Sequence, residues 1–129
     1  MNPLRVLIVT ALMLLVMGCG NAASPISNSE LSQRVVGDNA PMILDVRSGQ
    51  EYASGHVPGA INIPVDQLSA HLPELRRHDN AEIVVYCESG RRASKAADIL
   101  IGDGFLNVRH LEGDMRQWRR DGLPMASGN

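Results

Sequence analysis

Cysteine is scarce in this sequence, which has only Cys19 and Cys87 in 129 residues. Two thiols are too few for a disulfide-dense scaffold, and they cannot supply the four ligands of an all-cysteine zinc site. Aromatic residues are also few, with one Trp, one Phe and two Tyr, which excludes a base-stacking platform for nucleic acid. Basic residues are not in excess, since 12 Lys and Arg stand against 14 Asp and Glu. We therefore expect no nucleic-acid partner.

The apolar run near the N-terminus is too short for a membrane span. Residues 6–17 are 12 in number and Thr10 is the only polar one among them, whereas a membrane-spanning helix needs about 20 apolar residues. The run follows Arg5 and has the length of the apolar region of an export signal. We therefore expect export across the inner membrane and a periplasmic location.

Two cleavage sites are compatible with this signal. Residues 15–19 read Leu-Val-Met-Gly-Cys and resemble a bacterial lipobox, in which cleavage before Cys19 leaves its thiol for acylation. The alternative is an ordinary signal-peptidase cut slightly later, because Gly20 and Ala22 are small. The lipobox cut makes residues 1–18 the signal peptide, 19–28 a polar tether and 29–126 the folded domain, with membrane contact only through a lipid on Cys19. Either cut leaves Cys87 as a lone thiol in an oxidising compartment, where such a thiol is usually avoided or functional.

Short apolar strands alternate with amphipathic helices along the domain. The pattern predicts a first helix capped by Ser29, a short helix opened by the capping-box spacing of Ser48 and Glu51, and a helix capped by Asp66. Two further helices are expected at residues 91–101 and 114–120, and strands at 42–46, 60–64, 82–86 and 108–111. This alternation favours an α/β fold with a mainly parallel central sheet flanked by helices.

The most informative segment follows the strongest strand. Residues 87–92 read Cys-Glu-Ser-Gly-Arg-Arg and join that strand to a helix. The carboxyl end of a parallel strand is where ligands bind, and a helix N-terminus there directs backbone N–H groups and a positive dipole end toward an anion. The same field favours the thiolate of Cys87, and Gly90 supplies the freedom that a tight turn needs. The alternatives are an inert core cysteine and a solvated helix face carrying Arg91, Arg92 and Lys95.

Several motifs in order resemble single-domain rhodanese-like sulfurtransferases over residues 29–124. They are Leu44-Asp45-Val46-Arg47, Glu51-Tyr52, the run at residues 55–64 (Gly-His-Val-Pro-Gly-Ala-Ile-Asn-Ile-Pro), the Cys87 loop with Gly90 and Arg92, and Leu111-Glu112-Gly113-Asp114-Met115 with Trp118, Gly122 and Pro124. Each motif alone is weak, and the ordered set is specific. One departure is Asp114, because the family usually has a second glycine at that position.

The resemblance implies sulfur transfer by double displacement. Cys87 would take the outer sulfur of thiosulfate or a similar anion and hold it as a persulfide, hydrogen-bonded by the loop amides of Glu88, Ser89, Gly90, Arg91 and Arg92. Arg92 would orient the donor with help from Arg91. The acceptor would be a thiol, cyanide or a periplasmic protein. We expect no cofactor and no metal.

Two other functions stay open. Related folds use a Cys/Arg loop for phosphatase or arsenate reductase chemistry, but their spacing resembles Cys-x5-Arg, whereas here Arg92 makes Cys-x4-Arg and Ala93 occupies the wider-loop position. The other is a non-catalytic binding module or a redox partner, although a redox role lacks a resolving cysteine.

The remaining motif residues are interpreted as structural. Asp45, Arg47 and Glu51 are expected to form a buried ion-pair network beneath the loop, with a catalytic role as the alternative. His56 is expected to pack in its turn rather than act as a general base. Trp118 is expected to fill the core near the site.

Overall fold

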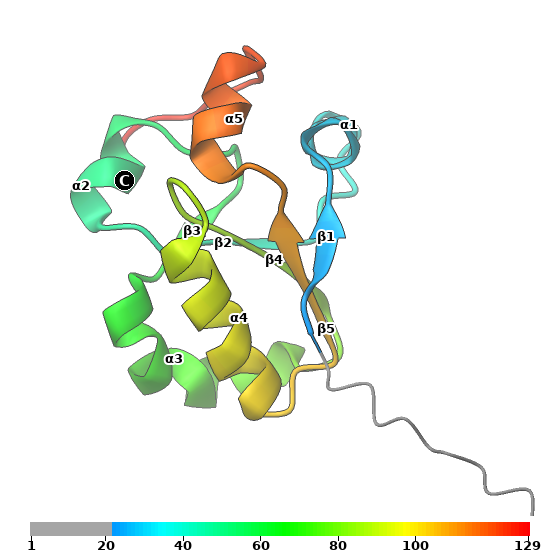
Figure 1. Ribbon diagram of the computed structural model, residues 1–129, viewed down its shortest axis with the longest axis vertical. Helices are drawn as coiled ribbons and strands as arrows, with labels where there is room; N and C mark the ends of the chain where they lie inside the picture. The colour runs from blue at the N-terminus through cyan, green and yellow to red at the C-terminus, as the bar shows by residue number, and fades with distance from the viewer. Residues whose placement is uncertain (1–21) are drawn as a thin grey trace, which may run out of the picture.

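A five-stranded parallel sheet organises residues 22–129, the part of the chain that this computed structural model describes (Figure 1). Its strands are β1 (Ser24–Ile26), β2 (Met42–Asp45), β3 (Ile61–Asn62), β4 (Glu82–Tyr86) and β5 (Asn107–Leu111), in the order β1-β5-β4-β2-β3. Every neighbouring pair runs parallel. The expected α/β fold with a parallel sheet is therefore confirmed.

Helices cover both faces of this sheet. They are α1 (Asn28–Val36), α2 (Gly49–Ser54), α3 (Leu68–Leu75), α4 (Arg91–Gly102) and α5 (Asp114–Arg120), with short 3₁₀ turns η1 (Val65–Gln67) and η2 (Arg76–His78). In Figure 1, α3 and α4 lie on one side of the sheet, and α1 and α5 lie on the other. Within residues 22–129, no helix combines the length and apolarity needed to cross a membrane.

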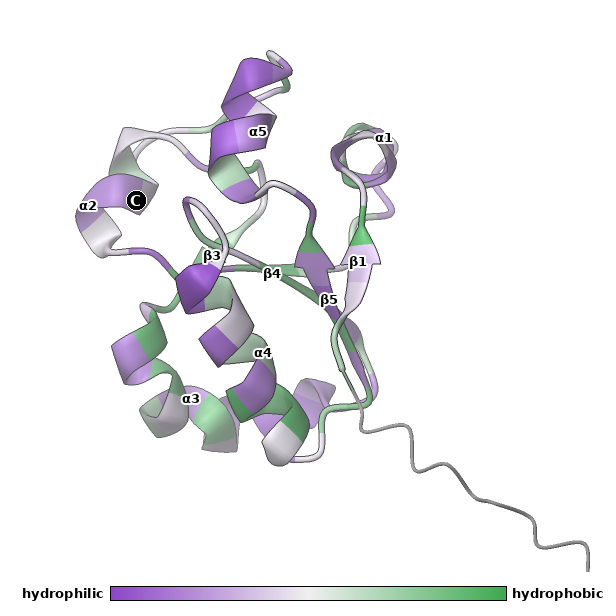
Figure 2. Cartoon of the chain, in the orientation of Figure 1, coloured by the Kyte–Doolittle hydropathy of each residue, from purple (hydrophilic) through white to green (hydrophobic). Residues whose placement is uncertain are grey.

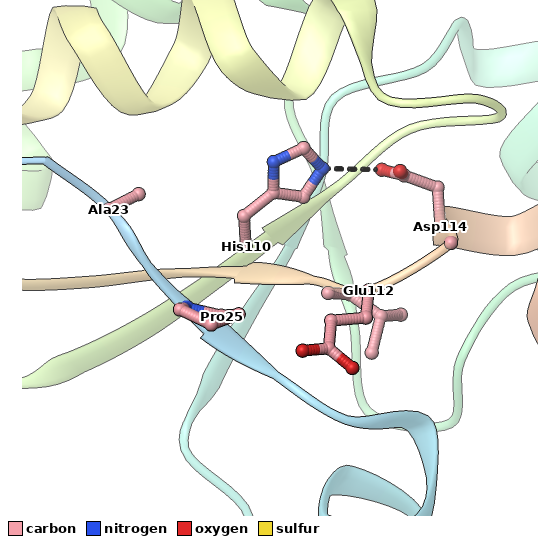
Figure 3. Close-up of a pocket in the computed structure, with 7 residues that line it drawn as sticks. Ala23, Pro25, His110, Glu112 and Asp114 are labelled. Carbon is pink, nitrogen blue, oxygen red and sulfur yellow. Dashed lines mark hydrogen bonds and ion pairs between the residues drawn. The ribbon is translucent and has the colours of Figure 1, made fainter.

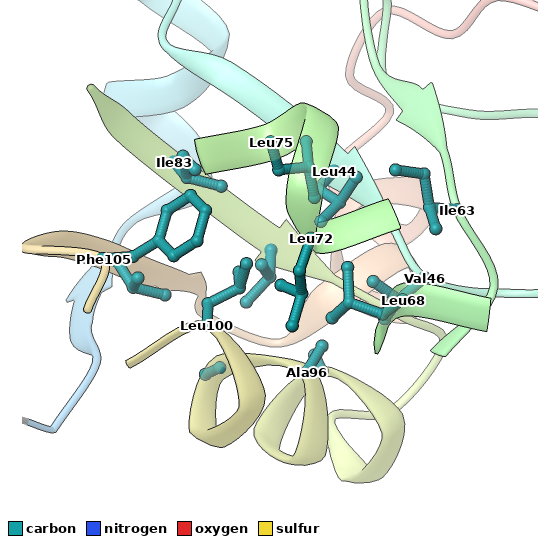
Figure 4. Close-up of a cluster of buried hydrophobic side chains, with 14 of the residues drawn as sticks. Leu44, Val46, Ile63, Leu68, Leu72, Leu75, Ile83, Ala96, Leu100 and Phe105 are labelled. Atoms are coloured by element: carbon teal, nitrogen blue, oxygen red, sulfur yellow. The ribbon is translucent and has the colours of Figure 1, made fainter. Parts of the chain in front are cut away.

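Alternation along the central strand β4 divides the core into two clusters. Ile83 and Val85 pack with α3 and α4, and Figure 4 shows Leu68, Leu72 and Leu75 of α3 facing this layer. Val84 and Tyr86 point to the opposite face and pack with α1 and α5. Figure 2 shows hydrophobic colouring along β4 and hydrophilic colouring over most of α5. A strand covered on both faces needs apolar residues in succession, which is why this one is the clearest in the sequence.

The predicted tether at residues 19–28 is wrong in its second half. Ser24–Ile26 form β1, which pairs with β5, and Ile26 is 1% exposed. Helix α1 begins at Asn28, with Ser27 as its cap instead of Ser29: the Ser27 hydroxyl accepts from the Glu30 amide at 3.0 Å. The folded domain therefore starts before residue 29. A three-residue strand containing a proline is too short to show a periodic pattern.

The predicted N-terminal cap is correct for α2 and incorrect for α3. Ser48 and Glu51 form the capping box that their spacing predicts at the start of α2. Asp66 does not cap α3, because it lies inside η1, whose backbone leads directly into the helix. The Leu68 amide donates to the carbonyl of Val65, so the turn supplies an acceptor without a side chain.

Candidate active site

Cys87 lies where β4 passes into α4, at the carboxyl end of the parallel sheet. Gly90, the N-cap of α4, has φ +109°, a left-handed conformation that glycine adopts without strain. Its N–H donates to Cys87 Sγ at 3.0 Å. Cys87 itself is 1% exposed. The predicted strand-to-helix turn is therefore present, and one of its amides bonds the sulfur.

The start of α5 supports this turn from the other side. The Met115 amide donates to the carbonyl of Cys87 at 3.0 Å, and the Arg116 amide donates to that of Glu88 at 3.1 Å. Asp114 Oδ1 accepts the Cys87 N–H at 3.0 Å. These three bonds fix the backbone of residues 87 and 88, so the position of Sγ depends on α5 as well as on β4 and α4.

Arg92 reaches the site but is already bonded. Its Nη1 and Nη2 donate to Glu51 Oε1 and Oε2 at 2.7 and 3.0 Å. This hydrogen bonding raises the pKa of Arg92 and, against the opposing effect of partial burial, lowers the pKa of Glu51 to about 2. The expectation that Glu51 joins Asp45 and Arg47 in one buried network is wrong, because Glu51 pairs with Arg92 at a half-exposed position.

The other predicted loop residues divide into paired and exposed side chains. Glu88 accepts two hydrogen bonds from Arg119 at 2.8 and 2.7 Å, which lower the pKa of the Glu88 carboxyl. Ser89 and Arg91 are exposed, as is Lys95 further along α4. The Glu88 side chain is thus fixed on α5, whereas the side chains of Ser89 and Arg91 are exposed to solvent.

A buried polar group supports the sheet under the loop. Arg47 and Asp45, 1% and 0% exposed, form an ion pair with Nη2–Oδ2 at 2.7 Å. The Tyr86 hydroxyl donates to Asp45 Oδ2 at 2.7 Å and accepts the Val57 N–H at 3.1 Å. Burial, followed by the neighbouring Asp45 charge, raises the pKa of Tyr86 far above its usual value, so Tyr86 stays a phenol. The expected Asp45–Arg47 pair is confirmed.

His56 and Trp118 behave as packing residues. The His56 ring stacks on Tyr52 with centroids 3.6 Å apart, and its Nδ1 lies 2.7 Å from the Tyr52 carbonyl oxygen. Trp118 is fully buried and its indole N–H donates to the Pro124 carbonyl at 2.8 Å. Both interpretations made from the sequence agree with these contacts.

His110 and Arg119 are site residues that the sequence argument missed. His110 Nε2 lies 2.9 Å from Asp114 Oδ1, the same oxygen that accepts the Cys87 N–H. Figure 3 shows the two side chains facing one another at a pocket of about 250 Å³, lined by residues 110–114 together with Ala23 and Pro25. Cys87 is not among its lining residues. The one available signal was Asp114 itself, a non-glycine residue directly after Gly113 in a turn.

Comparison with known proteins places this geometry in a family. The rhodanese-like domain family matches residues 27–121. A sulfurtransferase of Allochromatium vinosum is 30% identical over 102 residues, which cover 79% of this chain and 94% of that protein. The chain belongs to the rhodanese-like family. Two other curated relatives are longer proteins. The match to this rhodanese-like chain covers 53% of the length of one and 47% of the length of the other.

Solved structures share the fold. The Alr3790 protein from Anabaena sp. matches with a TM-score of 0.71 and 29% identity, over 79% of this chain and 81% of that one. The thiosulfate sulfurtransferase from Pseudomonas aeruginosa matches with a TM-score of 0.73 and 23% identity, over 81% of this chain and 20% of that one, a likeness of fold alone. A rhodanese-like domain with a sulfurtransferase among its relatives supports sulfur transfer as the general class of reaction.

Proposed function

We propose that this protein is a sulfurtransferase that carries sulfane sulfur as a persulfide on Cys87. The Cys87 thiolate attacks the outer sulfur of thiosulfate or a similar donor, the donor's sulfur–sulfur bond breaks, and sulfite leaves with that electron pair. A thiol, cyanide or a periplasmic protein then takes the outer sulfur and regenerates the thiolate. The observation that carries the proposal is the Gly90 amide directed at Sγ at the start of a 12-residue helix.

The loop geometry supports a sulfur anion at this place. The Gly90 N–H and the N-terminus of α4 present positive partial charge to Sγ, which suits an anionic persulfide at this place. The loop carbonyls are held by Met115 and Arg116, so the turn is organised before a donor arrives. Arg91 is exposed at the start of α4, four residues after Cys87, and offers a first contact for an anionic donor.

Intact mass tests the persulfide directly. Purified mature protein is incubated with thiosulfate, freed of small molecules and weighed by mass spectrometry, with Cys87→Ser as the matched control. We expect one added sulfur atom on the wild type, its loss on treatment with a thiol, and none on the variant. Unchanged wild-type mass with several sulfane donors, or equal addition to Cys87→Ser, would refute the proposal.

Phosphatase chemistry is disfavoured by the same loop. Arg92 follows Cys87 by five positions, and both of its Nη atoms donate hydrogen bonds to the Glu51 carboxylate. The narrower loop suits a single sulfur atom better than a tetrahedral oxyanion. Cys87-dependent hydrolysis of a generic phosphate monoester would reverse this preference.

The proposal includes export to the periplasm with Cys19 as a site of lipid attachment. The predicted signal peptide and Cys19 lie outside the described residues. Support for export and lipid attachment comes from the apolar run and from the resemblance of residues 15–19 to a lipobox. Metabolic labelling with a fatty acid should mark the wild type and not Cys19→Ala. A soluble periplasmic wild type without label would instead support the later signal-peptidase cut.

A further inference from the structure

Asp114 places a carboxylate beside the sulfur that the mechanism uses. It is 4% exposed and its Oδ1 lies 3.0 Å from the Cys87 nitrogen, so covalent geometry limits the distance from Oδ1 to Sγ to no more than about 7 Å. Its Oδ2 lies 3.1 Å from the point where a side chain on Gly90 would begin. The distance from Asp114 Oδ1 to Sγ is therefore shorter than the Debye screening length of about 10 Å at 0.1 M salt, so the two charges interact.

We propose that Asp114 determines donor specificity by charge. This inference rests on the proposed sulfur transfer. Asp114 disfavours dianionic donors such as thiosulfate. It favours sulfane donors with one negative charge or none, such as organic thiosulfonates and alkyl persulfides. A negative charge fixed near Sγ repels a donor that carries two negative charges more strongly than a donor that carries one.

Three arginines near Cys87 are held by carboxylates and are not free counter-charges for Asp114. Arg92 is paired with Glu51, Arg119 with Glu88, and the buried Arg47 with Asp45. Asp114 is the fourth carboxylate of this group, and Arg91 at the start of α4 is exposed. The Cys87 thiolate then adds a further negative charge. A site built this way does not concentrate dianions as a set of unpaired arginines would.

His110 Nε2 lies 2.9 Å from Asp114 Oδ1, the same oxygen that accepts the Cys87 N–H. That bond orients the carboxylate toward Cys87. Asp114 has φ +54°, and asparagine is the side chain that best tolerates this region. Asp114→Asn therefore removes the charge while keeping an oxygen to accept the Cys87 N–H.

Both classes of donor complete the same step. With thiosulfate, the thiolate bonds to the outer sulfur, the sulfur–sulfur bond breaks, and sulfite departs with the electron pair, leaving the Cys87 persulfide anion. With benzenethiosulfonate, a monoanion, the leaving group is benzenesulfinate and the enzyme product is identical. A protonated alkyl persulfide transfers its outer SH group and releases an alkyl thiolate. The donors therefore differ in charge and not in the bond that breaks.

The experiment compares two donors across three proteins. The kcat/KM values for thiosulfate and for benzenethiosulfonate are measured with one thiol acceptor, at mildly alkaline pH, for wild type, Asp114→Asn and Asp98→Asn. Asp98 is an exposed carboxylate on α4 and controls for the overall change in net charge. We expect Asp114→Asn to raise the ratio of thiosulfate to benzenethiosulfonate kcat/KM about fivefold, mainly through a lower KM for thiosulfate. Added salt should shrink the difference, and Asp98→Asn should leave the ratio unchanged.

A purely structural role for Asp114 gives a different result. Asp114→Gly, which suits the left-handed backbone, lacks an acceptor for the Cys87 N–H, so a structural role would lower kcat for both donors equally and Asp114→Asn would restore it. Equal changes for the two donors in Asp114→Asn, or an unchanged ratio, would overturn the inference. Failure of both donors to load wild-type Cys87 would instead refute sulfur transfer itself.

Discussion

At the scale of single residues, the geometry around Cys87 depends on a backbone amide at a position without a side chain. Gly90 directs its amide at Sγ from φ +109°, and a Cβ at this position would lie 3.1 Å from Asp114 Oδ2. Both facts come from the backbone path, so the hydrogen bond to Cys87 Sγ comes from a neighbour that has no side chain. The Asp45, Arg47 and Tyr86 group then fixes the strand end from which this turn departs.

Gly90→Ala should damage the loop more than an ordinary substitution. The left-handed backbone and the close Asp114 oxygen both oppose a methyl group, so we expect the free energy of unfolding to fall by about 1–2 kcal/mol and the rate of persulfide loading on Cys87 to fall with it. Urea denaturation and intact-mass kinetics measure the two effects. Gly102→Ala is the matched control, because Gly102 has open space and no left-handed φ. Equal behaviour of the two variants would contradict the role given to Gly90.

Tyr86→Phe should destabilise the protein by removing two buried hydrogen bonds. Removing the hydroxyl leaves the Val57 N–H without its acceptor, and it takes one donor from Asp45 Oδ2, which keeps its hydrogen bond from Arg47. We expect a loss of about 1–3 kcal/mol in the free energy of unfolding. Tyr52→Phe removes a hydroxyl that donates to the Ala60 carbonyl at a partly buried position, and it should cost less. A Tyr86→Phe variant as stable as the wild type would show that water replaces both bonds.

At the scale of elements, the sequence predicted the elements that local patterns determine, and it missed those that depend on remote neighbours or on backbone geometry. The capping box of α2 and the apolar run of β4 are local patterns, and both are found where they were expected. Strand β1 and the turn η1 depend on neighbours that are remote in sequence or on backbone geometry alone. β1 exists because Ile26 fills a space beside Leu111 of β5 in the second core cluster.

Ile26→Ala tests whether β1 belongs to the folded domain. Ile26 is 1% exposed, so the truncation should leave a cavity and lower the free energy of unfolding by about 2–4 kcal/mol. Val36→Ala at the end of α1 is the control, because Val36 is 72% exposed and its truncation should change stability by less than about 0.5 kcal/mol. Denaturant unfolding of the mature chain gives both values. Similar small losses would mean that residues 24–26 behave as the tether that the sequence suggested.

At the scale of the whole molecule, the position of Cys87 in the fold was predictable and the charge pairing around it was not. Cys87 lies at the end of a buried parallel strand, and such a strand is recognisable from a few consecutive residues. The ion pairs around it join residues far apart in sequence, 41 positions for Arg92 with Glu51 and 31 for Arg119 with Glu88. The motif therefore suggested that Arg92 is free to bind a donor, whereas the fold brings Glu51 to it, and it pairs Arg119, which no motif includes, with Glu88. Only the packing of α2 and α5 around the loop could reveal this.

These two ion pairs, and a third in which Arg34 Nη1 donates to Glu82 Oε1 at 2.6 Å, make the stability of the protein depend on pH. Hydrogen bonds from Arg92, Arg34 and Arg119 lower the pKa of Glu51 to about 2 and lower those of Glu82 and Glu88. A carboxyl whose pKa is lower in the folded state binds fewer protons there than in the unfolded chain. Its stabilising effect is fully present above the unfolded value of about 4.5 and is lost as pH falls toward the folded value.

Acid should therefore weaken the fold in a defined window. Between about pH 6 and pH 3 we expect the free energy of unfolding to fall by roughly 1–2 kcal/mol, a figure that allows for solvent screening of these partly exposed groups. Urea titrations at several pH values measure the fall. Glu51→Gln removes the carboxyl with the pKa of about 2 and should reduce the slope between about pH 4.5 and 2, whereas Glu74→Gln, which removes an exposed carboxyl on α3, should leave it unchanged. Stability that stays constant or rises as pH falls would mean that these pairs contribute no net stabilisation to the folded state.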